Sequence, residues 1–107
     1  MTTYQEAAKP LQIVLLTSLP MGMTAEALAA LTDLAVLMVT HGKTTEAANT
    51  LAYVMRHPDV PYETFDRAED LFIDLEAQLC PRVISDAQAL ASSLTLRGAL
   101  EAALAVE

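Results

Sequence analysis

TAEALAALTDLAVLMVTHGKTTEAANTLAYVMRH, residues 24–57, decides the fold because it predicts two helices joined at His41-Gly42-Lys43. Apolar residues of its first half recur every three or four positions, which is typical of an amphipathic helix. They are Leu28, Leu31, Leu34, Ala35, Met38 and Val39. Thr24 can cap this first helix, Gly42 can end it in a left-handed conformation, and Pro58 stops the second helix. Neither helix could bury its stripe alone, so we expect an antiparallel hairpin that packs on further helices.

The segments around this hairpin also carry helical periodicity, and no pair of strands is predicted. Pro10 lies within the first segment, so that helix is expected either to kink there or to begin at Lys9-Pro10. Thr95 can cap the last helix, whose end is expected to fray. The predicted helices are 3–18, 24–41, 44–57, 62–79, 82–92 and 96–105.

An internal repeat supports this reading. An acid followed by alanine occurs at 6–7, 46–47 and 86–87, which is a constant offset of 40 residues. The same offset aligns two further sets of apolar residues, namely Leu11, Leu51 and Ala91, and then Val14, Val54 and Leu94. Repeats of this length are typical of stacked helical hairpins. We therefore expect positions 7, 47 and 87 each to face a preceding helix.

The predicted fold class is all-α, with about 5–6 helices arranged as stacked antiparallel hairpins in a single domain over 1–107. Its parts are a partial hairpin 3–18, the central hairpin 24–57, a closing hairpin 62–92 and a terminal helix 96–105. On this reading, residues 3–18 form the second helix of a hairpin whose first helix is missing.

Composition and charge reduce the number of function classes that fit this chain. The formal charge of −8 argues against nucleic acid as a partner, because phosphate binding needs a basic surface. A single cysteine cannot form an internal disulfide, which fits a reducing compartment. The longest apolar run, Leu11–Leu16 with Gln12 inside it, is too short to span a membrane, and the N-terminus lacks the basic start of a signal peptide. The predicted location is cytoplasmic.

The central hairpin resembles a tetratricopeptide repeat. The resemblance rests on Leu31, Leu34, Ala35, Met38, Gly42, Ala47, Leu51, Val54 and Pro58. Val54 stands where the family usually has alanine, and the offset of 40 exceeds the family's usual period of about 34. The stretch HPDVPYETFDRAEDLFIDLEAQLCPRVISDAQAL, residues 57–90, is similar to the closing segment of repeat arrays in large signalling NTPases and MalT-like transcription regulators. The resemblance implies a sensing or partner-binding arm, whose partner is a separate protein or another domain of the same protein.

Acidic residues gather in residues 58–79, which hold seven carboxylates against Arg67 alone. Four of them run down one face of the predicted helix, opposite its apolar stripe: Glu63, Asp66, Asp70 and Asp74. A straight helix cannot wrap these side chains around one cation, so calcium binding is not expected. The remaining readings are a solvated face and a docking surface for a basic protein partner.

The first predicted helix carries more apolar side chains than one neighbour can cover, and its charges are Glu6 and Lys9. These apolar side chains are Leu11, Ile13, Val14, Leu15 and Leu16. An uncovered apolar patch usually marks a contact site. The sequence therefore predicts that the isolated chain forms a homodimer through this helix.

No metal, cofactor or catalytic site is predicted. His41 and His57 each end a helix, where an imidazolium complements the helix dipole, and no nucleotide loop, catalytic triad or zinc spacing occurs. The function expected is non-catalytic binding of a protein or ligand. Two alternatives remain open, namely a homo-oligomerisation domain and a helical carrier of a small apolar ligand. The carrier alternative is based on Met21, Met23, Met38 and Met55 in or beside the central hairpin.

Overall fold

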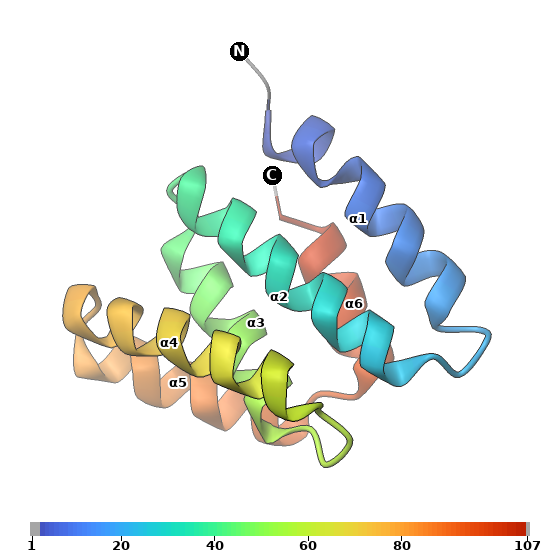
Figure 1. The fold of residues 1–107 in the computed structure, drawn as a ribbon. Helices are drawn as coiled ribbons and strands as arrows, with labels where there is room; N and C mark the ends of the chain where they lie inside the picture. The colour runs from blue at the N-terminus through green and yellow to red at the C-terminus, as the bar shows by residue number, and fades with distance from the viewer. Residues whose placement is uncertain (1–2, 107) are drawn as a thin grey trace.

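The computed structural model describes residues 3–106, and these residues form six helices and no strand (Figure 1). The helices are α1 (Tyr4–Ser18), α2 (Thr24–Thr40), α3 (Thr44–Arg56), α4 (Tyr62–Gln78), α5 (Pro81–Ser93) and α6 (Leu96–Leu104). The all-α class is therefore confirmed. Each helix predicted from periodicity is present, and each of its ends lies within one residue of the predicted position.

The pair α2 and α3 forms the centre of the molecule. Helix α2 packs against α1 on one side and α3 on the other, and it contributes eight buried residues to the core. Five of the six residues of the predicted stripe are fully buried, namely Leu28, Leu31, Leu34, Ala35 and Met38, and the sixth, Val39, is half-buried. A threonine also lies in this core without penalty, since the Thr32 hydroxyl donates a hydrogen bond to the Leu28 carbonyl at 3.0 Å.

Glycines end the first two helices in the same way. Gly42 has φ of +76°, its N–H donates to the Val39 carbonyl, and the following Lys43 N–H donates to the Met38 carbonyl. Gly22, at φ +71°, occupies the equivalent place after α1. The chain therefore reverses direction sharply at both ends of α2. The predicted cap at Thr24 is wrong, because the structure has Met23 at that N-cap and no side-chain hydrogen bond there.

Helices α4 and α5 both pack against α3, and α4 reaches α2 as well (Figure 1). Helix α6 does not extend this row of helices. It packs on α2 and α3 instead, and its end lies beside the first turn of α1. The radius of gyration is 12.6 Å, close to the value of about 13 Å expected for a folded domain of this length.

Burial at the positions aligned by the offset of 40 agrees between α3 and α5 at Ala47 and Ala87, but not between α3 and α1. Ala47 and Val54 of α3 are fully buried, whereas the aligned Ala7 is half-buried and the aligned Val14 is 43% exposed. The reason is that α1 packs on α2 through a different face. Residues of α1 that align with buried residues of α3 are therefore not buried to the same extent. The proposed start at Lys9-Pro10 is also wrong, since α1 begins at Tyr4 and runs through Pro10.

Among the described residues, no helix has the length and apolar character needed to cross a bilayer.

Candidate functional site

The inner face of α1 contacts the end of α2 and the end of α6. Its buried residues are Tyr4, Ala8, Leu15 and Ser18, at the spacing of one helical stripe. The Tyr4 ring lies edge-on to His41 with centroids 6.1 Å apart, and its hydroxyl donates to the Ala103 carbonyl at 3.5 Å. The Gln5 side-chain amide donates to the Leu104 carbonyl at 3.4 Å and also to the Val106 carbonyl. Burial raises the pKa of Tyr4 to about 12, because the neutral phenol is favoured away from water.

The outer face of α1 is apolar and exposed. Ile13, Leu16 and Val14 expose 59%, 56% and 43% of their surface. Of the five residues predicted for self-association, these three are placed where another molecule can reach them. Leu15 is a correction, because it is fully buried in the core and belongs to the inner face. Leu11 is half-buried at the edge between the two faces.

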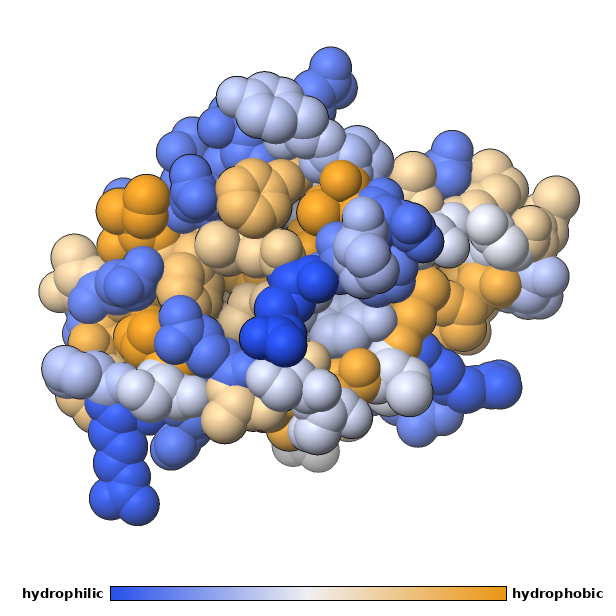
Figure 2. All heavy atoms as spheres, turned by 90° about the horizontal axis from the view of Figure 1, so that it is seen from below, coloured by the Kyte–Doolittle hydropathy of each residue, from blue (hydrophilic) through white to orange (hydrophobic). Residues whose placement is uncertain are grey.

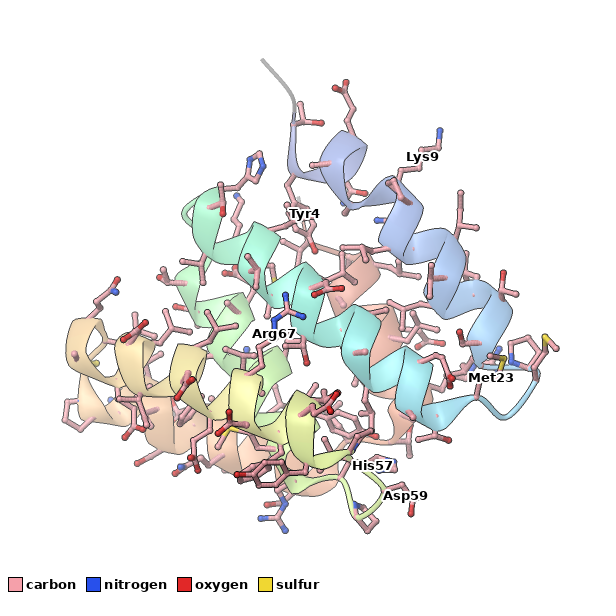
Figure 3. All side chains as sticks on the ribbon, in the orientation of Figure 1. Tyr4, Lys9, Met23, His57, Asp59 and Arg67 are labelled. Atoms are coloured by element: carbon pink, nitrogen blue, oxygen red, sulfur yellow. The ribbon has the colours of Figure 1, made fainter. Side chains whose placement is uncertain are left out.

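The acidic face of α4 is exposed as the sequence predicts. All four carboxylates named for partner binding, Glu63, Asp66, Asp70 and Asp74, lie at exposed positions. None of them forms an ion pair with the described residues. Arg67 points instead toward α2, where it pairs with Asp33 (Figure 3). This face therefore presents negative charge that the rest of the described chain leaves uncompensated.

The two histidines lie at the C-caps of α2 and α3, as predicted. His57 also shapes the following turn, because its Nδ1 accepts a hydrogen bond from the Asp59 N–H at 3.1 Å (Figure 3). Its ring is edge-on to Tyr53, with centroids 6.0 Å apart. In residues 3–106, no three His, Cys, Asp or Glu side chains are grouped as metal ligands.

The methionines do not form the cluster that the sequence places near the central hairpin. Met38 is fully buried in the core, while Met21 and Met23 are exposed in the connection between α1 and α2. Met55 alone lines a groove, together with side chains of α4 and α5. Of the four methionines on which the carrier alternative is based, Met55 is therefore the one that lines this groove.

That groove lies between α4 and α5, has α3 as its floor, and has a volume of about 350 Å³. It is lined by Ala52, Met55, Arg56, Phe65, Phe72 and Gln88. The face seen in Figure 2 carries apolar side chains, interrupted by hydrophilic ones, on the side where α4 and α5 lie. Sequence reasoning missed this site. Its one signal was Phe65 at the edge of the α4 stripe, where an aromatic ring could remain half-buried.

Comparison with known proteins finds no matching family model, no matching curated protein and no matching solved structure. The resemblance to tetratricopeptide repeats therefore stays a prediction.

Proposed function

We propose that this chain is a non-catalytic helical module that binds other proteins, and that the outer face of α1 is its principal contact surface. The observation that carries the proposal is the exposure of Ile13, Val14 and Leu16 on a helix whose other face is already packed in the core. A helix segment that is apolar on two opposite faces normally has neighbours on both. The described part of the chain supplies α1 with neighbours on its inner face alone.

A second copy of the chain is the occupant proposed for the isolated protein. Each large aliphatic side chain gains about 1.5–3 kcal/mol when it is fully buried, and these three are already about half covered. Six such side chains across a two-fold axis then contribute about 4–9 kcal/mol, against an association cost of about 4–15 kcal/mol. The contact is therefore expected to be weak and concentration-dependent rather than permanent.

The proposed setting is a regulatory arm of a larger cytoplasmic signalling protein. The support for this setting is the resemblance of the central hairpin to tetratricopeptide repeats, together with an all-α fold that agrees with it. In such a protein, a helix of an adjacent domain or repeat would cover the same face of α1 that a second copy covers in isolation.

A matched pair of variants tests the α1 contact. Ile13→Lys places a charge in the proposed interface, and Ile73→Lys makes the same change on α4 at almost equal exposure, 59% against 54%. Sedimentation equilibrium from 10 µM to 1 mM is expected to show a weight-average mass that rises with concentration for the wild type and for Ile73→Lys. Ile13→Lys is expected to remain monomeric. A monomeric wild type, or equal loss of association in both variants, would contradict the proposal.

The acidic face of α4 is the second proposed contact, and its partner is a basic protein segment. The observation that favours it is the absence of ion pairs on Glu63, Asp66 and Asp70 within the described residues. A lysine-rich peptide is expected to bind the wild type, and more weakly as salt shortens the Debye length to about 8 Å at physiological ionic strength. Changing those three residues to lysine is expected to abolish binding.

The control for that experiment changes the same number of charges elsewhere. Glu26, Glu46 and Glu101 are also exposed, and they lie on α2, α3 and α6. If the lysine triple variant at these positions weakens peptide binding as much as the α4 triple variant does, the attraction depends on net charge and the α4 face has no special role.

A further inference from the structure

A hollow on the other side of Arg56 continues the groove between α4 and α5. It has a volume of about 250 Å³ and is lined by Tyr53, Arg56, His57, Pro58, Ala91 and Leu94. Because Arg56 lines both cavities, the two adjoin at its side chain. The 350 Å³ groove falls within the range of about 300–1,000 Å³ that is usual for small-molecule sites.

The two cavities differ in chemistry. Four of the six residues of the groove are apolar, and two of these are the phenylalanines Phe65 and Phe72 of α4. The hollow beyond Arg56 is instead lined by three residues that carry hydrogen-bond donors, namely Tyr53, Arg56 and His57. Among the described residues, every fully buried side-chain oxygen or nitrogen has a hydrogen-bond partner. The Tyr53 hydroxyl has no such partner. This hydroxyl therefore reaches solvent, although its residue is only 5% exposed.

His57 and Tyr53 can each donate a hydrogen bond at this end of the site. His57 Nδ1 already accepts the Asp59 N–H, so the neutral imidazole carries its proton on Nε2 (Figure 3). Burial raises the pKa of Tyr53, so its hydroxyl keeps its proton at neutral pH. With the five N–H donors of the Arg56 guanidinium, this end of the site is built to receive an acceptor.

The charge around Arg56 favours an anion as that acceptor. The described arginines that form ion pairs are Arg67, with Asp33, and Arg97, with Glu101, and Arg56 is not among them. No carboxylate lines either cavity, although the chain has 14 acidic residues. A guanidinium binds a carboxylate through two parallel hydrogen bonds, which makes it well suited to anchor that group.

We propose that the groove between α4 and α5 binds a small amphipathic monocarboxylate with an unbranched aliphatic body. The carboxylate pairs with Arg56 at the mouth of the polar hollow. The aliphatic body lies in the groove against the half-buried Met55 and Phe65, with the more deeply buried Phe72 beneath it. This site is separate from the α1 contact, since it shares no residue with it.

The binding of octanoate, measured by isothermal titration calorimetry with amide chemical-shift mapping, tests the proposal. Octanoate is expected to bind one site per chain and to shift amides of α3, α4 and α5. Each methylene added from hexanoate to octanoate should tighten binding about two- to fourfold, because about 0.8 kcal/mol follows the burial of one methylene. Octanamide, which has the same body without the charge, should bind more weakly than octanoate.

Variants at exposed positions distinguish the contribution of the carboxylate to binding from that of the aliphatic body. Arg56→Gln is expected to weaken octanoate binding about tenfold or more, since hydrogen bonds to charged groups contribute about 1.5–3 kcal/mol. It should weaken octanamide binding by a smaller factor, because a neutral amide oxygen accepts a weaker hydrogen bond than a carboxylate does. Arg82→Gln is the matched control, because Arg82 is an exposed arginine of α5 that lines neither cavity. Gln88→Trp fills the groove from an exposed position and should abolish binding of both ligands, with Gln88→Leu as a smaller filler if the tryptophan lowers the melting temperature.

Three results would overturn the proposal. The first is the absence of saturable octanoate binding to the wild type. The second is equal weakening by Arg56→Gln and Arg82→Gln, which would mean that octanoate responds to overall charge. The third is a set of chemical shifts that maps to α1 while Gln88→Trp binds as well as the wild type.

Discussion

Leu34 and Leu51 have no solvent-exposed surface, and one lies on each helix of the α2–α3 pair. Shortening either to alanine is expected to lower the free energy of unfolding by about 2–5 kcal/mol, because apolar burial is lost and a cavity remains. Leu90→Ala, at a position that is 40% exposed, is the control and should change it by about 0.5 kcal/mol or less. Urea unfolding curves of the three variants measure this. Equal effects at all three positions would contradict the assigned core.

Burial of Tyr4 makes the free energy of unfolding depend on pH. Its pKa is about 12 in the folded chain because of burial, against about 10 when unfolded, so ionisation favours the unfolded state. The stability that comes from the neutral phenol is fully present below pH 10 and is lost as pH rises from 10 to 12. Urea unfolding over this range should show a steeper loss for the wild type than for Tyr4→Phe. Parallel loss in both proteins would mean that Tyr4 is accessible to water.

Single helices were predictable from sequence, and the faces that they bury were only partly so. The α2 stripe could be read from periodicity because α2 has neighbours on most sides and one continuous set of apolar positions. In α1, apolar side chains occur all round the second half, so periodicity could not separate the buried Leu15 from the exposed Ile13 and Leu16. The choice is made by how α1 docks on α2, which local sequence does not contain.

The caps show the same limit at the ends of helices. Thr95 caps α6, and its hydroxyl accepts the Gly98 N–H at 3.0 Å, whereas Thr24 caps nothing. Thr95→Ala is expected to lower the free energy of unfolding by about 0.5–2 kcal/mol, since a helix N-terminus loses its side-chain partner. Thr24→Ala should have a smaller effect. Thermal melts of the two variants check this, and a larger loss at Thr24 would show that the cap assignment is wrong.

The α4–α5 groove could not be predicted because its lining comes from three different helices. Arg56 ends α3, Phe65 lies in the first turn of α4, and Gln88 lies in the middle of α5. Nothing in the spacing of these residues marks them as neighbours. The acidic face of α4 is the opposite case, since its carboxylates share one face of a single helix and the helical period alone places them together.

At the scale of the whole molecule, α6 turns a row of helices into a closed body. It packs on α2 and α3, and its last residues receive hydrogen bonds from Tyr4 and Gln5 of α1. The first and last helices are therefore joined on one side of the central pair, with α4 and α5 on its other side (Figure 1). With α6 on its inner side, α1 remains at the edge of the molecule with an apolar outer face.

The proposed contact through that face is tested most directly by intermolecular nuclear Overhauser effects in a mixture of isotope-labelled and unlabelled chains near 1 mM. The account predicts cross-chain signals from the methyl groups of Ile13, Val14 and Leu16, and none from the equally exposed Ile73 of α4. Cross-chain signals from Ile73 without signals from Ile13, or none at all at this concentration, would contradict the account.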